Sequence, residues 1–328
     1  MKFDVVINTD DNYIQHCMSM LCSLYENNKD HSITLHILSN KLNSRNKDLI
    51  TAISDRYNNS AVFHNIDEER IGDVQFRKQR PLSKAAYYRL LLASVLDSSI
   101  HRVLYLDCDM IVMQDVSSLF EIELDEYALA ACRDDFPYSN QHRKQLHMEA
   151  GEKVFCSGIM LVNLDYWRNG QYEGKLLEYA HRKRTEVHLH DQDVLNYVFK
   201  KKWFVLPPKW NRNAYIDNAL PFDGLLPFDY SEYTYSPVVL HYASVGMKPW
   251  IDVNFPNRKP YLKYLKMSGF PNPTFQKGTF GMHAKAAVMC VSIWLNRYIW
   301  PYTPKLLRQL FIDIINLLTL PFRLLRNI

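Results

Sequence analysis

A single run of ten residues, 103–112, constrains the fold of this chain most strongly. The run is apolar and contains Val, Leu, Tyr and Ile, except that Asp107 and Asp109 interrupt it. This pattern predicts a buried strand that is covered on both faces, as in a parallel sheet, and that ends in the two carboxylates and then resumes. Residues i and i+2 of an extended chain point to the same side, so the two carboxylates repel unless a cation lies between them. We therefore expect a divalent metal site, with a strand-end turn, where Asp is also favoured, as the alternative.

Short apolar segments alternate with amphipathic ones along most of the chain. This alternation predicts an α/β fold whose central sheet is mostly parallel and flanked by helices. The expected strands lie at residues 3–7, 33–38, 61–66, 103–112, 127–131, 155–164, 203–206 and 238–242. The expected helices lie at residues 14–25, 48–57, 83–96, 115–120, 166–184 and 194–199.

The composition sets limits on the class of protein. A chain of 328 residues with 47% hydrophobic residues can form one large α/β domain with an appendage. The net charge of +4 does not argue for a nucleic-acid partner. The six cysteines are scattered without a C-x-x-C pair, which favours reduced thiols in a cytosolic protein. The polar first residues do not fit a signal peptide, so we expect a protein on the cytoplasmic side of the membrane.

Several residues have more than one interpretation. Asp10 and Asn12 follow the first strand, where a loop before a helix can bind a nucleotide, but turn and capping chemistry also explains them. Arg89 lies in an apolar helix, so it either extends to the surface or crosses to a buried carboxylate or phosphate. Gly158 enters a strand and suggests a close approach to the backbone. Asp191 is a plausible helix cap.

The last part of the chain differs in character. Residues 285–328 contain six Lys or Arg and one Asp, together with Trp294 and Trp300. No uncharged run reaches the roughly 20 residues that a membrane span needs. Basic amphipathic helices with aromatic residues favour the surface of an anionic bilayer, and a docked helix pair is the alternative. We expect a main domain at residues 1–270 and a helical tail at residues 271–328 that attaches to the membrane surface.

Six spaced motifs occur in an order that resembles glycosyltransferase family 8. This family includes the retaining bacterial lipopolysaccharide galactosyl- and glucosyltransferases and their glycogenin relatives, and the resemblance covers about residues 3–250. The motifs are residues 8–13 (NTDDNY), the helix with Arg89, residues 106–109 (LDCD), residues 155–158 (FCSG), residues 190–193 (HDQD), and His241 followed by residues 248–250 (KPW).

The resemblance implies a GT-A fold and assigns roles to these residues. Asp107, Asp109 and His241 are the implied ligands of Mn²⁺, which Mg²⁺ could replace. The implied catalytic and sugar-binding residues are Arg89, Asp134, Gln192 and Asp193. Lys248 would bind the diphosphate. The full set implied to bind the UDP-sugar is Asn8, Asp10, Asn12, Arg89, Asp107, Cys108, Asp109, Cys156, Ser157, Asp191, Gln192, His241, Ser244, Gly246 and Lys248.

The implied reaction transfers galactose or glucose from a UDP-sugar to a hydroxyl of a glycan acceptor, with retention at the anomeric carbon. The amide of Gln192 is a poor nucleophile, which favours a front-face mechanism over double displacement. The implied acceptor is the lipopolysaccharide core or another lipid-linked glycan at the inner face of the cytoplasmic membrane. This chain departs from the family in having Cys156 where Asn is usual, and in a segment one residue longer between His241 and Lys248.

Two other functions compete with this interpretation. A phosphatase of the haloacid dehalogenase type also has D-x-D at a strand end, but Ile111 replaces the Thr or Val of that motif. The second competing function is that of a non-catalytic relative that binds a nucleotide-sugar or a membrane. The presence of Asp107, Asp109, Gln192 and His241 together argues against it, because a binding module needs fewer of these residues.

Overall fold

The computed structural model describes residues 1–74, 83–134, 144, 146, 148–149, 152–182, 189–214, 236–243, 246–298, 302, 304 and 307. The described residues fall into two compact units. The first lies within residues 1–212, 230–241 and 260–273, and the second within residues 213–229, 242–259 and 274–328. The expected division into residues 1–270 and 271–328 stays a prediction.

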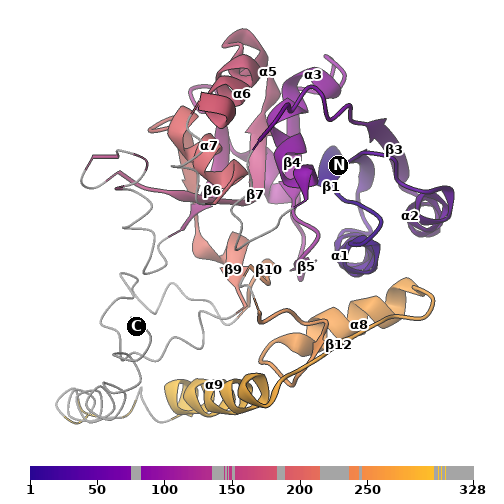
Figure 1. The fold of residues 1–328 in the computed structure, drawn as a ribbon, viewed down its shortest axis with the longest axis vertical. Helices are drawn as coiled ribbons and strands as arrows, with labels where there is room; N and C mark the ends of the chain where they lie inside the picture. The colour runs from indigo at the N-terminus through magenta and orange to yellow at the C-terminus, as the bar shows by residue number, and fades with distance from the viewer. Residues whose placement is uncertain are drawn as a thin grey trace. The chain divides into compact units, whose positions relative to one another are not determined.

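A seven-stranded sheet forms the centre of the first unit, in the order β3-β2-β1-β4-β7-β6-β8 (Figure 1). Neighbouring strands are parallel except that β7 runs antiparallel to both β4 and β6. This arrangement confirms the predicted α/β fold with a mostly parallel sheet. The strands are β1 (Lys2–Asn8), β2 (Ser32–Ser39), β3 (Ser60–Asn65), β4 (Arg102–Leu106), β6 (Leu129–Arg133), β7 (Phe155–Asn163) and β8 (Trp203–Leu206).

Helices cover the sheet because its central strands are apolar on both faces. On one face, Val6, Tyr105 and Met160 pack with residues of the helices η1, α3, α5, α6 and α7 in one buried cluster. Helices α1 and α2 lie side by side away from that cluster (Figure 1). The bounds are α1 (Ile14–Glu26), α2 (Ser44–Arg56), η1 (Lys84–Leu91), α3 (Leu92–Val95), η2 (Ser117–Glu121), α5 (Leu164–Asn169), α6 (Tyr172–Arg182), α7 (Asp191–Val198) and η3 (Pro208–Asn211).

Several helix predictions were wrong in detail. The short helix expected at residues 115–120 is the 3₁₀ helix η2, and the helix expected at residues 48–57 begins at Ser44. The α-helix expected at residues 83–96 is mostly a 3₁₀ helix, η1, followed by one turn of α-helix. The helix expected at residues 166–184 is divided between α5 and α6, because Gln171 has a φ of +51° and cannot continue a right-handed helix. Asp191 is the first residue of α7 rather than its cap, which is His190 with a φ of +55°.

The strand expected at residues 103–112 is interrupted at the two Asp residues as predicted, but its two parts belong to two different sheets. β4 ends at Leu106, and β5 (Met110–Val112) leaves the main sheet to pair antiparallel with β10 (Val239–His241). These strands and β9 (Arg212–Asn213) form a second sheet in the order β5-β10-β9. Asp107 and Asp109 therefore lie in the turn where the chain passes from one sheet to the other.

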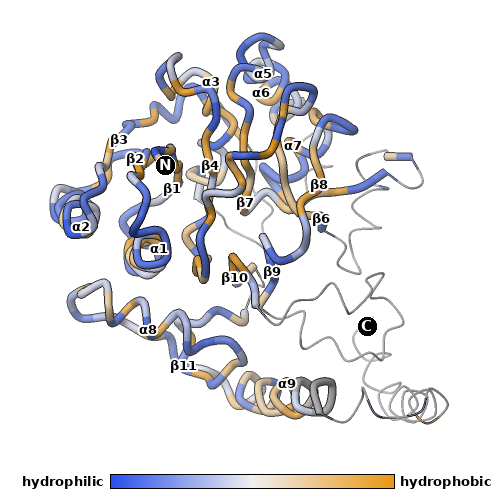
Figure 2. The backbone as a smooth tube through the Cα atoms, turned by 180° about the vertical axis from the view of Figure 1, so that it is seen from behind, coloured by the Kyte–Doolittle hydropathy of each residue, from blue (hydrophilic) through white to orange (hydrophobic). Residues whose placement is uncertain are grey.

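The C-terminal part contains α8 (Arg258–Ser268), the short strands β11 (Ile251–Asp252) and β12 (Gln276–Lys277), and α9 (Phe280–Tyr298). In α8, the hydroxyl of Tyr261 contacts Gln15 and His16 of α1. Apolar and polar stretches mix along α9 (Figure 2), where Val288, Val291 and Trp294 are 59%, 57% and 52% exposed. Among the described residues, none of the helices has the length and apolar character that crossing a membrane requires.

Candidate active site

The sheet topology explains why distant motifs meet at one edge of the first unit. Asp107 follows the carboxyl end of β4, and β7 begins at the same edge because it runs antiparallel to β4. The backbone N–H of Asp107 accordingly donates to the carbonyl of Gly158 at 2.9 Å. In the second sheet, the register of β10 with β5 places His241 opposite Met110, the residue after Asp109.

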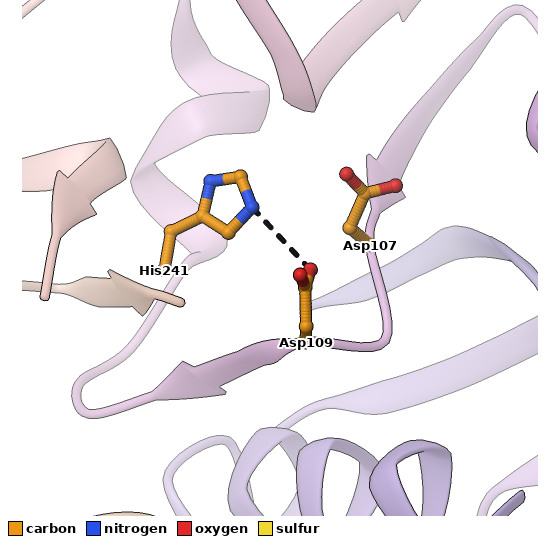
Figure 3. A group of neighbouring side chains, drawn as sticks. All are labelled: Asp107, Asp109 and His241. Carbon is orange, nitrogen blue, oxygen red and sulfur yellow. Dashed lines mark ion pairs between the residues drawn. The ribbon is translucent and has the colours of Figure 1, made fainter. Parts of the chain in front are cut away.

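Asp107, Asp109 and His241 form a group that could hold a metal ion. One ligand atom from each residue lies within 4.8 Å of the others, and the three side chains converge (Figure 3). His241 Nε2 lies 3.3 Å from Asp109 Oδ1. Two carboxylates and one imidazole are ligands that suit Mn²⁺. The predicted metal ligands are thus brought together by the fold, and their residue types fit the ion.

The orientation of the His241 ring also fits a ligand role. Its Nδ1 lies 3.0 Å from Asn211 Oδ1, so a proton on Nδ1 leaves Nε2 facing the carboxylates. Burial lowers the pKa of this imidazole, but the charge of the Asp109 carboxylate and the hydrogen bonds of the His241 ring with Asp109 and Cys156 outweigh burial and raise the pKa to about 10. The neighbouring Asp109 carboxylate therefore favours the protonated form of His241.

Gly158 lies where a side chain would enter this group. A Cβ atom added there would lie 2.5 Å from His241 Cε1, 2.8 Å from Met110 Cε and 3.0 Å from Asp107 Oδ2. The close approach that the sequence suggested at Gly158 is therefore an approach to the side chains of the metal group. Any larger residue must displace at least one of them.

Arg89 crosses to buried carboxylates rather than extending to the surface. The residue is only 5% exposed, and its Nη2 and Nε atoms lie 2.7 Å and 3.1 Å from carboxylate oxygens of Asp107 and Asp191. Burial lowers the pKa of the Arg89 guanidinium, but these two carboxylates have the larger effect, so the pKa lies above the ordinary value for arginine. Burial raises the pKa of Asp191 to about 6, with Arg89 lowering it and Asp107 raising it.

Gln192 is held in one orientation by partners on both sides. Its Oε1 accepts from the backbone N–H of Ser157 at 3.0 Å, and its Nε2 donates to Asp134 Oδ2 at 2.9 Å. Asp193 Oδ2 accepts from the backbone N–H of Leu189 at 2.6 Å, so this carboxylate faces its own helix start. Gln192 and Asp134 therefore form one unit beside Ser157, whereas Asp193 has a local structural contact.

The loop after β1 has the turn contacts that its composition suggested. Asp10 Oδ1 accepts from the backbone N–H groups of Asn12 and Tyr13, which is turn chemistry. Asn8 donates through Nδ2 to the Ala85 carbonyl, and its buried Oδ1 has no hydrogen-bond partner among the described residues. The Cys108 thiol donates to the Asn8 carbonyl at 3.3 Å, which ties this loop to the turn between Asp107 and Asp109.

The other predicted site residues have different positions. The Cys156 Sγ lies 3.9 Å from His241 Nδ1, at the border of the metal group. Gly246, with a φ of +76°, and Lys248 belong to the second unit, where Lys248 Nζ donates to the Tyr242 carbonyl at 2.6 Å. Ser244 lies outside the described residues.

Sequence reasoning missed three residues that support the site. Tyr105 donates its hydroxyl hydrogen to Asp107 Oδ1 at 2.8 Å, and Asn211 contacts His241 as described. Asn196 accepts from the Phe155 N–H and donates to the Phe155 carbonyl, both at 2.8 Å. Only Tyr105 had a signal in the sequence, because it lies two residues before Asp107 on the same side of a strand.

The comparison with known proteins agrees with this geometry. The model of glycosyl transferase family 8 matches residues 4–254. General stress protein A of Bacillus subtilis (strain 168) is 29% identical over 285 residues, covering 83% of this chain and 97% of that protein. The lipopolysaccharide 1,2-glucosyltransferase of Escherichia coli is 25% identical over 280 residues, covering 84% of this chain and 81% of that protein.

A solved structure shares the fold. The crystal structure of the galactosyltransferase LgtC in complex with donor and acceptor sugar analogues superposes with a TM-score of 0.70 at 22% identity, covering 86% of this chain and all of that one. This likeness confirms the GT-A fold. The family match spans most of the chain and includes the motifs around Asp107, Gln192 and His241. This chain therefore belongs to glycosyl transferase family 8.

Proposed function

We propose that this protein is a retaining hexosyltransferase that moves galactose or glucose from a UDP-sugar to a hydroxyl of a glycan acceptor. The observation that carries the proposal is the convergence of Asp107, Asp109 and His241 at the same sheet edge as Arg89 and Gln192. Membership of a glycosyltransferase family supports the reaction type and argues against a phosphatase.

Asp107, Asp109 and His241 would hold Mn²⁺ or Mg²⁺ in this proposal. A divalent ion bound there would neutralise charge on the diphosphate of the donor. The chain supplies a fixed arrangement of ligands, since Arg89 holds Asp107 and Asn211 holds His241. We also assign Lys248 to the diphosphate, and Asp10 and Asn12 to the nucleoside. These three assignments rest on their positions in the motifs.

Gln192 has a role that its contacts support. Its side chain is fixed by the Ser157 N–H and by Asp134, so its carbonyl oxygen has a set direction at the site. An amide oxygen is a poor nucleophile but can stabilise a developing positive charge through its dipole. We therefore propose a front-face reaction in which Gln192 stabilises the sugar cation without bonding to it. Arg89, Asp134 and Asp193 are assigned to the donor sugar from their positions in the motifs.

The names of relatives guide the choice of substrates. The Escherichia coli relative is a lipopolysaccharide 1,2-glucosyltransferase, and the structural relative is a galactosyltransferase. We propose UDP-glucose or UDP-galactose as donor, and a lipopolysaccharide core or other lipid-linked glycan as acceptor. The basic tail would bring the enzyme to the inner face of the cytoplasmic membrane, where such acceptors occur.

The test measures UDP release from a panel of nucleotide-sugars in the presence of Mn²⁺, with and without glycan acceptors. We expect one UDP-hexose to react, with the reaction lost in Asp109→Asn and after metal removal with EDTA. Asp125→Asn is the matched control, because this carboxylate has an 86% exposed side chain at the opposite end of β4 from Asp107. Absence of UDP binding in the wild type would refute the proposal.

The role of Gln192 has its own test. Gln192→Ala should lower kcat by more than it raises KM for the donor, because the lost interaction is strongest in the transition state. Anomeric configuration of the product, read by NMR, tests retention. Full activity of Gln192→Ala, or an inverted product, would contradict the proposed mechanism while leaving the family assignment intact.

A further inference from the structure

Tyr105 presents its phenol directly to a ligand of the proposed metal site. The residue lies on β4, is fully buried, and points to the same side as Asp107 two positions later. Its hydroxyl donates to Asp107 Oδ1 at 2.8 Å. Arg89 Nη2 donates to the same oxygen at 2.7 Å. The Arg89 guanidinium also lies over the Tyr105 ring, with Cζ 4.3 Å from the ring centroid.

These contacts divide the two oxygens of Asp107 between different tasks. Oδ1 accepts two short hydrogen bonds, one of them from a cation, which fixes the rotation of the carboxylate. Oδ2 lies on the side of Gly158 and His241. A Cβ atom placed on Gly158 would lie 3.0 Å from Oδ2 and 2.5 Å from His241 Cε1. The oxygen that faces His241 is thus the one without these two donors.

A structural explanation of Tyr105 is incomplete. A buried phenol needs a hydrogen-bond partner, and the neighbouring strand positions Val103, Leu104 and Leu106 are filled by residues that need none. The cluster around β4 could pack a phenylalanine ring equally well, because only the hydroxyl reaches the carboxylate. The hydroxyl therefore acts on Asp107 rather than on the packing of the core.

We propose that Tyr105 is a positioning residue that, together with Arg89, directs Oδ2 of Asp107 to the metal. The inference rests on the proposed function, because it assumes that Asp107 binds a divalent cation. Hydrogen-bond partners of metal ligands typically change metal affinity or activity by 10–100-fold when they are removed. Tyr105 differs from Arg89 in having no charge, so its effect on the cation is one of geometry.

The test compares Tyr105→Phe with Tyr25→Phe. Tyr25 is equally buried, and its hydroxyl lies 2.9 Å from Ser54 Oγ in α2. Both variants lose one buried phenol hydrogen bond and keep the ring. Mn²⁺ affinity is measured from the electron paramagnetic resonance signal of free Mn²⁺, without substrate. We expect Tyr105→Phe to weaken Mn²⁺ binding by about tenfold, with Tyr25→Phe at the wild-type value although both variants lower Tm.

A second variant addresses the case in which Tyr105→Phe does not fold. Arg89→Lys keeps a positive charge but removes the planar donor pair, and it should also weaken Mn²⁺ binding about tenfold. Where both single variants fold, the double variant should lose less affinity than the product of the single losses, because both donors fix the same oxygen. Independent effects on Mn²⁺ affinity would contradict a shared role.

The outcomes separate the two proposals. Wild-type Mn²⁺ affinity in Tyr105→Phe, beside loss in Asp109→Asn, would overturn the role of Tyr105 and leave the metal site in place. Absence of Mn²⁺ binding in the wild type would overturn both. A lower Tm with unchanged Mn²⁺ affinity in both tyrosine variants would assign Tyr105 to stability alone.

Discussion

At the scale of single residues, the sequence indicated the candidate metal ligands more clearly than the residues that hold them in place. Asp107 and Asp109 were recognisable because two carboxylates two positions apart in an apolar strand repel unless something compensates them. Asn211 gave no such signal, because its contact with His241 spans 30 residues and depends on the pairing of the second sheet. A supporting residue needs only a partner in space, and spacing along the chain does not reveal that partner.

Gly158→Ala tests how tightly the metal group is packed. The added Cβ would meet His241 Cε1 at 2.5 Å, so the His241 or Met110 side chain must move. We expect Mn²⁺ affinity to fall by at least about tenfold and stability to fall by about 1–3 kcal/mol. Isothermal titration with Mn²⁺ and urea unfolding measure the two effects.

Gly174→Ala is the matched control for this prediction. Gly174 lies on α6, and a Cβ atom there would meet nothing within 4 Å. Alanine in a helix should raise stability by up to about 1 kcal/mol and leave metal binding unchanged. Equal Mn²⁺ affinity in both glycine variants would show that the group has room that the structure does not indicate.

At the scale of elements, the site depends on one strand that runs against its neighbours. The predicted elements were mostly found, but sequence patterns do not give strand direction or register. β7 is antiparallel to β4, and this brings Ser157 and Gly158 to the same edge as Asp107. Similarly, β5 leaves the main sheet because it pairs with β10, 127 or more positions later in the chain, and no local pattern encodes this pairing.

Asn196→Ala tests the link between β7 and α7. The Asn196 side chain satisfies both the N–H and the carbonyl of Phe155, and it also donates to the Gln192 carbonyl at 3.0 Å. Alanine leaves these buried backbone groups unpaired, which should lower the free energy of unfolding by about 2–4 kcal/mol. Urea unfolding measures the loss. A change below about 0.5 kcal/mol, as expected for exposed Asn169→Ala, would contradict this role.

Tyr88→Phe tests a pH-dependent link between η1 and the turn after β3. The Tyr88 hydroxyl donates to Glu68 Oε1 at 2.6 Å, and this bond is the main cause that lowers the pKa of Glu68 below its ordinary value of 4.5. A lowered folded-state pKa gives stability that is present above pH 4.5 and lost as pH falls through the folded pKa. Tyr88→Phe should therefore cost about 1 kcal/mol at pH 7, because the Glu68 side chain is 35% exposed.

The same reasoning predicts how this cost changes with acid. The difference in unfolding free energy between wild type and Tyr88→Phe should shrink below pH 4.5, as Glu68 takes up a proton. Tyr25→Phe is the control, because its partner Ser54 does not titrate in this range. Urea unfolding between pH 3 and pH 7, measured at about every half pH unit, distinguishes Tyr88→Phe from Tyr25→Phe. A constant cost in Tyr88→Phe would contradict the link to Glu68.

At the scale of the whole molecule, the order of the motifs was enough to predict the family and the fold. No such motifs lie in the C-terminal part, so its role could not be predicted in the same way. Motif order survives changes in loop length, so residues 4–254 match the family model at low identity to individual relatives. The tail lies beyond that match, and its composition alone suggests its role. Its described part includes the helix α9, in which Lys285 and the apolar residues Val288, Val291 and Trp294 are exposed.

The tail should bind the full chain to anionic membranes. Residues 285–328 carry six Lys or Arg and one Asp, and each basic residue near an anionic surface contributes about 1 kcal/mol. We expect the protein to sediment with vesicles that contain phosphatidylglycerol and to remain in solution with purely zwitterionic vesicles. High salt should reverse the binding, because the attraction is screened.

Replacing Lys285 and Arg297 with Glu should weaken the binding to anionic vesicles, whereas the same change at Lys29 and Lys47 in the first unit should not. Equal binding to both vesicle types would assign the attachment to the apolar residues of the tail rather than to its charge, and no binding to either would remove the membrane from the proposed function.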